Sequence, residues 1–594
     1  MPIVLDISGP NLIIKALSGP KFSTDRDRIN RLQGRIPRWS IDKSTGEEIF
    51  LHWEISRSQL NDVLSLWDLE TEIIPSERVS SLLTGFQKAS IPISELVRED
   101  FEFEIRDGRK LKPHQQDFVA IEGERNKFIV ASKIGSGKTL MAFARACRLG
   151  FNKLLIICPV TCIPEWTREI YDTKDIPYMV YRGDKKKRTR LREELDNFPV
   201  IITNYEMVGE LNKLCSDVKF EQVIIDEAHN IASTDTILYK EHDKLIRRNM
   251  ASGLQLLTGT AIRNHIEDLW SLCNWINPDL LGSKSKFLSR YRVETRWKNV
   301  TTKTGRVWKI PIQFQYRHTD ELYEKLKSVM IQSNVDHLQT WEDCTDIINI
   351  SITGKQRELY EQARTAIILD VESGELPLNN VLTRVLRLQE IAEGLYNLNP
   401  AWKDSGKLDY IKYELEHTNE KVIIWSRFVQ IHDEIKALFP DRTVLYEGGM
   451  SDGARFLSKI AFQGCKNVEE EKEFYRIKKY HPDFKFEPGE ATVLTGTIHM
   501  RTGIGSNFQA CAYQIFPSFD HVHTTNLQAA GRILRIGQEA EKVYTKYLVA
   551  EHTIERQYLL KSMNHYAMLA NIQGGKGSSE GLKNAEVLNL LRGM

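Results

Sequence analysis

Short apolar runs recur through the middle of the chain, and most of them lead into a polar turn and then a helical pattern. Examples are KFIVAS at 127–132, LLIICPV at 154–160 and NFPVIIT at 197–203. Runs of this length, rich in Val, Ile and Leu at successive positions, predict strands that are buried on both faces of a sheet. Their alternation with helical stretches predicts βαβ units, and therefore an α/β fold with a parallel sheet.

The length and composition limit the class of protein. With 594 residues the chain is too long for one hydrophobic core, and we expect two to four domains. No apolar run reaches the roughly 20 residues of a membrane helix, and MPIVLDISGP at the start does not resemble a signal peptide. We therefore expect an intracellular protein without a membrane partner, cytoplasmic in a bacterium or phage and nuclear in a eukaryote.

Neither charge nor cysteine usage points to a specific ligand. The net charge is +1, so nucleic-acid binding would have to come from local basic segments. The candidates are residues 26–39, 182–192 and 476–481, although runs of this kind are usually solvated surfaces. The eight cysteines form no CxxC pair, which argues against a zinc site or a disulfide framework.

The segment after the first of these strands has the pattern of a phosphate-binding loop. IGSGKT at 134–139 follows KFIVAS and precedes a helical pattern. The glycines allow a tight turn that aims N–H groups inward at the start of a helix, and Lys138 and Thr139 add a cation and a hydroxyl suited to Mg²⁺. Ser132 replaces the first glycine of the usual motif. We predict that phosphate groups contact this loop, at the residues Gly135, Ser136, Gly137, Lys138 and Thr139.

Two carboxylates follow another apolar strand. VII at 223–225 leads into DEAH, which begins with Asp226 and Glu227. In open α/β sheets the carboxyl ends of the strands are where ligands bind. We predict that Asp226 holds Mg²⁺ together with Thr139, and that Glu227 acts as the base toward an attacking water. A later run, LQLLTGT at 254–260, brings two threonines to the same edge.

The order of these motifs resembles that of superfamily 2 helicases, in particular the SWI/SNF-related group of double-stranded DNA translocases. The matching segments are LKPHQ at 111–115, IGSGKT, LLIICPVTCIPEWTREI at 154–170, DEAH, LTGTAIRNHIEDLWSLCNWINP at 257–278, SGKL at 405–408, KVIIWSRFVQIHDEI at 421–435, GIGSNF at 503–508 and QAAGRILRIGQ at 528–538. The resemblance implies two RecA-like lobes that close on ATP, with Gln115 reading the adenine.

The last motif carries two arginines, Arg532 and Arg535. Their spacing places both side chains on one face of a short helix. A solvated basic helix face is the simple alternative. The resemblance instead implies that both are arginine fingers, which reach from the second lobe to the γ-phosphate of ATP on the first.

The first hundred residues contain none of these motifs. RIPRWSI at 35–41 and IFLHWEI at 49–55 flank a polar turn and predict a β-hairpin, with a helix that starts at Ser56 or Ser58. The arrangement resembles the HARP-like recognition domains of annealing helicases and phage branched-DNA helicases. That resemblance implies DNA contacts by Arg35 and Arg38. The alternative is a small docking domain whose tryptophans belong to its core.

These observations predict two RecA-like α/β lobes and a small α+β N-terminal domain. We place the N-terminal domain at 1–100, lobe 1 at 101–290, a linker or insertion at 291–350, lobe 2 at 351–572 and a tail at 573–594. Residues 463–490 look like a charged insertion. We expect a monomeric ATP- and Mg²⁺-dependent translocase on duplex DNA that remodels branched or forked DNA. The alternatives are an RNA helicase, a motor that strips proteins from DNA, or a nucleotide-gated DNA-binding switch.

Overall fold

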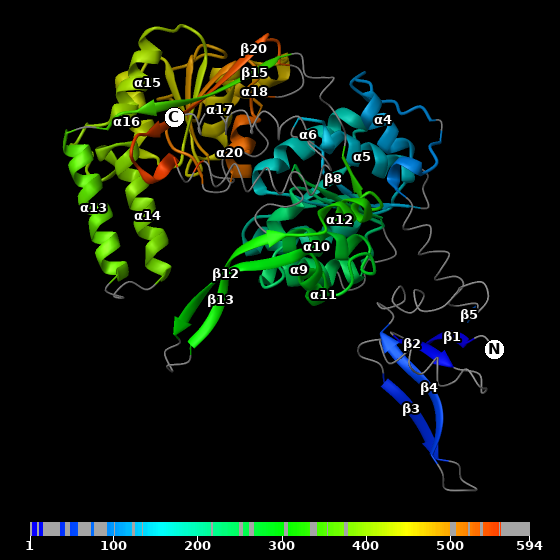
Figure 1. Ribbon diagram of the computed structural model, residues 1–594. Helices are drawn as coiled ribbons and strands as arrows, with labels where there is room; N and C mark the ends of the chain where they lie inside the picture. The colour runs from blue at the N-terminus through cyan, green and yellow to red at the C-terminus, as the bar shows by residue number, and fades with distance from the viewer. Residues whose placement is uncertain are drawn as a thin grey trace.

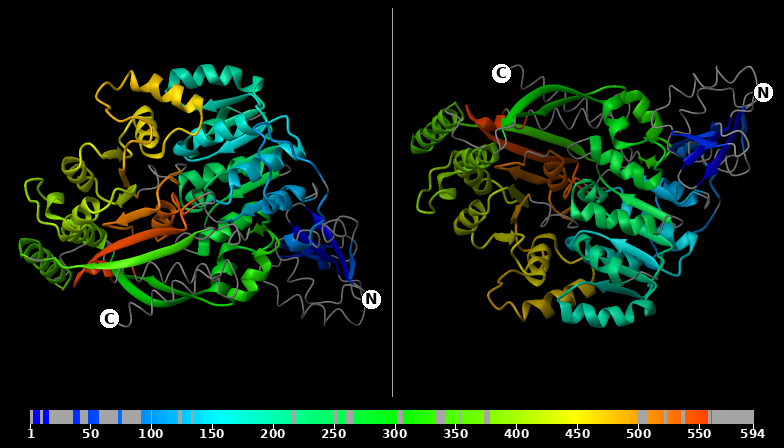
Figure 2. Two further views of the ribbon diagram at one scale, coloured as in Figure 1. Left: turned by 90° about the horizontal axis from the view of Figure 1, so that it is seen from above. Right: turned by 90° about the horizontal axis from the view of Figure 1, so that it is seen from below.

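A computed structural model gives the arrangement of most of the chain (Figures 1 and 2). The residues that it describes are 3–8, 11–15, 36–41, 48–56, 73–75, 92–99, 101–121, 125–132, 135–214, 218–248, 253–259, 266–301, 307–332, 341–352, 354–372, 378–498, 507–520, 523–534, 538–556 and 559.

The first large sheet has seven strands, all of them parallel to their neighbours. In spatial order they are β14 (Met330–Ile331), β6 (Lys127–Val130), β11 (Gly253–Leu257), β10 (Gln222–Ile225), β7 (Leu154–Ile157), β9 (Val200–Thr203) and β8 (Tyr178–Tyr181). Every residue of β7, β9, β10 and β11 is buried, as the continuous apolar runs predicted.

Helices cover both faces of this sheet. One face packs against α4 (Pro113–Ala120), α5 (Lys138–Leu149) and α6 (Ile163–Thr173). The other packs against α8 (Val208–Leu214), α9 (Ile237–Arg248), α10 (Ile266–Ile276), α11 (Lys284–Tyr291) and α12 (Thr319–Leu326). The remaining helix, α7 (Lys185–Glu194), has no buried residue. Short 3-10 turns complete this part at Ile93–Glu95, Val160–Cys162, Leu195–Asn197, Tyr205–Met207 and Ala228–Ile231.

The second large sheet has six parallel strands. Their order is β15 (Glu342–Ile350), β20 (Lys542–Ala550), β19 (Tyr513–Phe516), β16 (Val422–Ser426), β18 (Val493–Thr497) and β17 (Thr443–Tyr446). Around it lie α13 (Gly354–Glu372), α14 (Leu378–Glu393), a 3-10 turn (Leu395–Asn397), α15 (Gly406–Glu416), α16 (Gln430–Leu438), α17 (Asp452–Gln463), α18 (Val468–Lys478) and α20 (His523–Ala530).

The predicted fold class, α/β with two lobes built on parallel sheets, is confirmed by these two sheets. A separate antiparallel ribbon of β12 (Arg292–Thr301) and β13 (Val307–Tyr316) lies between β11 and β14 in the chain, within the segment that forms the first lobe. The sequence had indicated only a linker or insertion there. The positions of the domain boundaries remain predictions.

The N-terminal region contains a sheet of its own. Its strand order is β3 (Ile36–Ile41), β4 (Glu48–Ser56), β2 (Asn11–Lys15), β1 (Ile3–Ser8) and β5 (Ile73–Pro75). β3 and β4 pair antiparallel, so the predicted hairpin is present. The helix predicted from Ser56 or Ser58 lies outside the described residues, apart from Ser56, which ends β4.

The stretch predicted to be a charged insertion contains a helix, α18. α18 carries charged side chains outward, but its Phe474 is fully buried against Leu457 and Ile460 of α17. An ion pair joins this helix to the first lobe, because Nη1 of Arg168 on α6 lies 3.0 Å from Oε1 of Glu470. Within the described part of the chain, no helix combines the length and the apolar character needed to span a bilayer.

Candidate nucleotide-binding site

The loop between β6 and α5 has the backbone geometry of a phosphate cradle. Gly135 and Gly137 have φ angles of 84° and 79°, in the left-handed region that favours glycine. α5 then begins at Lys138, so its unpaired N–H groups and positive dipole end face the loop. Space also requires glycine at one position: a Cβ on Gly137 would lie 2.3 Å from Nε2 of Gln115.

Gln115 ties α4 to this loop. It is buried, its Nε2 donates to the carbonyl of Ser136 at 3.2 Å, and its Oε1 accepts from the backbone N–H of Lys112 at 2.9 Å. Nε2 of His114 lies 2.9 Å from the same Ser136 oxygen. The sequence resemblance implied an adenine contact for Gln115, which remains a prediction. The contact to the loop is a second role that the sequence did not reveal.

Lys138 and Thr139 open the helix, as the sequence predicted. The ammonium of Lys138 donates to the carbonyl of Ser132 at 2.9 Å, so the side chain is folded back over the loop. Thr139 is half-buried in the first turn of α5. A lysine held over such a loop can transfer its hydrogen bond to phosphate oxygens when a nucleotide enters.

Asp226 follows β10 and is buried among polar partners. Its Oδ2 accepts from Nε1 of Trp166 at 3.0 Å, and its Oδ1 accepts from the N–H of Glu227 at 2.9 Å. Burial raises the pKa of Asp226 to about 6, with a further contribution from the Glu227 carboxylate, while Lys138 acts in the opposite direction. Each oxygen keeps a lone pair, so the carboxylate fits a hard cation such as Mg²⁺.

Glu227 has a strained backbone that its neighbours hold in place. Its φ of 46° is left-handed, which is rare for a residue with a side chain and frequent at functional sites. The hydroxyl of Tyr205 donates to the carbonyl of Asp226 at 2.5 Å and to that of Glu227 at 3.2 Å. On the side-chain side, Nδ1 of His229 lies 3.3 Å from Oε2 of Glu227 and 2.9 Å from Oγ1 of Thr258.

The strand order explains why these groups meet. β6, β11, β10 and β7 are consecutive neighbours and parallel, so their carboxyl ends lie at one edge. The phosphate loop follows β6, Thr258 follows β11, Asp226 follows β10, and the helix of Trp166 follows β7. Trp166, Tyr205 and His229 were missed because the sequence does not give the strand order. Their position just after predicted strands is the signal that could have found them.

Arg532 lies in the second lobe, but not on a helix with Arg535 as the spacing suggested. α20 ends at Ala530, and Arg532 lies in the turn that follows, where its N–H bonds to the carbonyl of Ala529, three residues back. Gly531 lowers helix propensity at this point, and the chain tightens into i→i−3 bonding. The prediction that Arg532 lies on a short helix was therefore wrong.

The position of Arg532 is compatible with a role between the lobes. Its side chain is buried, and its carbonyl accepts from the N–H of Phe508 at 3.0 Å. This hydrogen bond joins the motif at 503–508 to the motif at 528–538. α20 lies on the side of the second lobe that faces the first (Figures 1 and 2). Arg535 lies outside the described residues.

The predicted DNA contacts of the N-terminal region are not tested by the structure. Arg38 belongs to β3, where its Cα is paired with that of His52 across the hairpin. Arg35 lies outside the described residues. Both assignments remain predictions.

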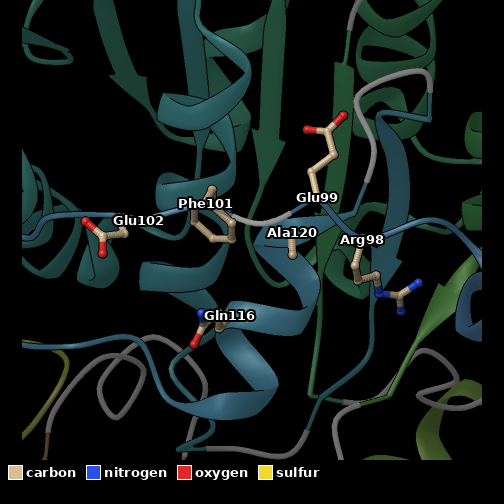
Figure 3. Close-up of a pocket in the computed structure, with 6 residues that line it drawn as sticks. All are labelled: Arg98, Glu99, Phe101, Glu102, Gln116 and Ala120. Atoms are coloured by element: carbon tan, nitrogen blue, oxygen red, sulfur yellow. The ribbon is translucent and has the colours of Figure 1, made fainter.

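A cavity of about 440 Å³ beside α4 does not suit a nucleotide (Figure 3). The described residues that line it include Glu99, Glu102 and one cation, Arg98. Arg98 is engaged by Asp117, with Nε 3.0 Å from Oδ1. Negative charge at this place would repel a triphosphate, and none of the predicted ATP-binding residues is among the residues that line the cavity.

Comparisons with known proteins agree on one family. The family model described as the SNF2-related domain matches residues 37–397. The chain is 24% identical over 512 residues to the ATP-dependent DNA helicase DDM1 of Arabidopsis thaliana, covering 78% of this chain and 62% of that protein. It is 25% identical to an uncharacterized ATP-dependent helicase of Mycoplasma pneumoniae, covering 77% of this chain and 42% of that protein. The chain thus spans less than two thirds of either relative.

Among solved structures, the Sulfolobus solfataricus SWI2/SNF2 ATPase core in complex with dsDNA matches with a TM-score of 0.35 and 18% identity. The match covers 82% of this chain and 98% of that one.

Proposed function

The chain belongs to the family of proteins with an SNF2-related domain, and on that premise we propose that it is a DNA-dependent ATP hydrolase that translocates along double-stranded DNA. One observation carries the proposal. The glycine loop follows β6 and the pair Asp226–Glu227 follows β10, so both lie at one edge of the first sheet. Thr258 follows β11, the strand between β6 and β10. A phosphate-binding loop beside a metal-binding carboxylate and a second carboxylate is the set of groups that an ATP hydrolase requires.

Each residue of the site has a proposed task. Lys138 and the N–H groups of the loop bind the β- and γ-phosphates of ATP, and Gln115 contacts the adenine. Thr139 and Asp226 hold Mg²⁺, which neutralises charge on the phosphates when bound. Glu227 orients the attacking water and accepts its proton, and Nδ1 of His229 lies 3.3 Å from its Oε2.

Hydrolysis is proposed to depend on how the two lobes meet. Arg532 and Arg535 belong to the second lobe and act as arginine fingers, which would make turnover respond to lobe closure. DNA that touches both lobes would then be moved as the cleft opens and closes. The ion pair between Arg168 and Glu470 is a contact that such a motion would have to change.

The preferred DNA is proposed to be branched or forked, as in replication, recombination or repair. This part rests on the HARP-like resemblance of the N-terminal hairpin, with Arg35 and Arg38 as phosphate contacts. We propose a monomer acting inside the cell. An RNA helicase, a protein-stripping motor and a nucleotide-gated switch are the competing functions.

The test is the rate of ATP hydrolysis with no nucleic acid and with single-stranded DNA, duplex DNA, forked DNA and duplex RNA. Forked and plain duplex DNA should stimulate strongly, and RNA should not. Stimulation by RNA alone would favour the RNA helicase, and binding of DNA with no turnover would favour the switch.

Branch recognition by the N-terminal region is tested by a double variant. Arg35→Ala/Arg38→Ala should keep the stimulation by plain duplex and lose the preference for forks. Each lost phosphate contact should flatten the log–log salt dependence of fork binding by about 0.9. An unchanged fork preference would remove branch recognition from the proposal and leave a plain duplex translocase.

A further inference from the structure

A basic cavity lies outside the nucleotide site, where the β12–β13 ribbon leaves the first lobe. It has a volume of about 810 Å³ and lies between α11 and the inner ends of β12 and β13. Its lining includes three cations, Lys284, Arg292 and Arg317, and two hydroxyls, Ser285 and Ser289. The described residues that line it include no carboxylate. Cavities of this size, with a few convergent polar groups, are typical of binding sites.

Two of the three positive charges have neutral partners. Nζ of Lys284 donates to the hydroxyl of Thr234 at 2.6 Å. Arg317 donates through Nε to the carbonyl of Arg290 at 2.9 Å, and through Nη2 to the carbonyl of Ser289. Hydrogen bonds to neutral oxygens position these side chains without cancelling their charge, so each remains able to attract an anion.

The nearby carboxylates are already engaged by other cations. Glu267 pairs with Arg292, the third cation of the cavity. On α12, Glu321 accepts from Nε of Arg290 at 3.0 Å and from the hydroxyl of Tyr291 at 2.8 Å. The Arg290 hydrogen bond lowers the pKa of Glu321 to about 2. These carboxylates are therefore poorly placed to neutralise Lys284 and Arg317.

The ribbon continues the same sign of charge away from the lobe. Residues 292–316 contain six Lys or Arg residues and one acidic residue, Glu294. β12 and β13 each have ten residues, which corresponds to a length of roughly 33 Å. Figure 1 shows the ribbon projecting from the first lobe, and β12 follows α11 directly in the chain. A two-stranded ribbon of this kind fits along or within a groove of duplex DNA.

We propose that this cavity binds backbone phosphates of duplex DNA, and that the cavity and the β12–β13 ribbon together form a DNA contact separate from the N-terminal region. The proposal rests on the proposed function, because it takes DNA as the substrate. Lys284 and Arg317 supply the charge, and Ser285 and Ser289 offer hydroxyls to the phosphate oxygens.

The experiment measures binding of a fluorescent 30-base-pair duplex to the full chain between 50 and 200 mM NaCl. The variant is Lys284→Gln/Arg317→Gln, in which amide groups can replace the donors to Thr234 and Arg290. The control is Arg364→Gln/Lys412→Gln, which removes two exposed charges from α13 and α15 in the second lobe.

Loss of two phosphate contacts should flatten the log–log slope by about 1.8, so that the fourfold salt increase weakens binding about 12-fold less than in the parent. The control should follow the parent. Lys284→Gln alone, which perturbs the fold less, should give a change of about 0.9. Parallel salt dependence of the parent and both Lys284 variants would overturn the inference.

Two further arms separate the possible causes. Inorganic phosphate at equal ionic strength should compete no better than sulfate, since the site needs a polymer; selective competition by phosphate would assign the cavity to a small anion instead. If the parent itself neither binds duplex nor hydrolyses ATP in response to it, the proposed function fails. If the parent does both, and the Lys284 variants show the same salt dependence of duplex binding as the parent, only the proposed role of the cavity fails.

Discussion

The hydrogen bond from Trp166 stabilises the ionised form of the Asp226 carboxylate and partly offsets the effect of burial on its pKa. Nε1 lies 3.0 Å from Oδ2, and burial together with Glu227 raises the pKa of Asp226 to about 6. A hydrogen bond to a charged group contributes ~1.5–3 kcal/mol, so Trp166→Phe should raise this pKa by roughly one to two further units. At pH 7 the ionised fraction would fall from about nine tenths to between about a half and a tenth.

The assay is a Mg²⁺ titration of ATP hydrolysis at pH 7.0 and at pH 8.5. Because only the ionised carboxylate binds Mg²⁺ well, the half-activating concentration should rise ~2- to 10-fold at pH 7.0 and return close to the parent value at pH 8.5. Tyr205→Phe is the matched control. It removes a buried hydroxyl that donates to the Asp226 carbonyl and not to the carboxylate. An equal shift at both pH values, or none, would refute the reasoning.

Three further predictions concern other parts of the chain. Arg532→Ala and Arg535→Ala should each lower turnover by ~10³-fold or more while ATP affinity, measured by equilibrium binding, changes far less; a variant that hydrolyses at the parent rate would exclude its residue as a finger. Lys407→Met should lower the free energy of unfolding by ~3–5 kcal/mol, because it leaves Glu555 buried without its cation; urea denaturation should show this loss, and Lys407→Met/Glu555→Gln should recover part of it. Burial lowers the pKa of His432 to about 3, and neither ring nitrogen has a hydrogen-bond partner. Below about pH 6.5 the unfolded chain therefore binds a proton at His432 that the folded chain does not bind. The free energy of unfolding should fall on acidification by up to ~1.4 kcal/mol per pH unit. His432→Leu should reduce that slope in urea titrations between about pH 6.5 and 4.

The elements that local pattern determines were predictable from the sequence. The apolar runs that became β6, β7, β9, β10 and β11 are continuous because both faces of these strands are covered by helices. The glycine loop was equally predictable, because its positive φ angles and the start of α5 at Lys138 are determined by the local sequence. The β3–β4 hairpin followed from two strand patterns around a polar turn.

Contacts between segments distant in the chain were not predictable in this way. Gln115 reaches Ser136 across 21 residues, and Trp166 reaches Asp226 across 60. The first contact depends on how α4 packs beside the loop after β6, and the second depends on β7 and β10 being neighbours; no local sequence pattern reports either arrangement. The helix predicted for Arg532 is absent for a different reason: the arginine spacing is compatible with a helix, but α20 ends at Ala530 and the chain continues in a tighter turn after Gly531.

The β12–β13 ribbon was not predicted because its many charged and polar residues weaken the strand pattern. Residues 292–316 alternate irregularly and contain many polar side chains, so the strand pattern was weak. Pairing over most of both strands, with a register shift between Glu294 and Trp297, is what makes them a ribbon. The same holds for α18, where Phe474 is the residue that anchors an otherwise charged helix.

The most direct test of the central claim is single-turnover ATP hydrolysis with and without duplex DNA, measured alongside ATP binding for the parent, Lys138→Ala and Glu227→Gln. The parent should hydrolyse ATP much faster with DNA than without it. Lys138→Ala should lose both binding and hydrolysis, whereas Glu227→Gln should retain bound ATP and lose hydrolysis, because only the proposed base is removed. Hydrolysis by Glu227→Gln at the parent rate would contradict the account, and so would a parent rate of hydrolysis that is the same with and without duplex DNA.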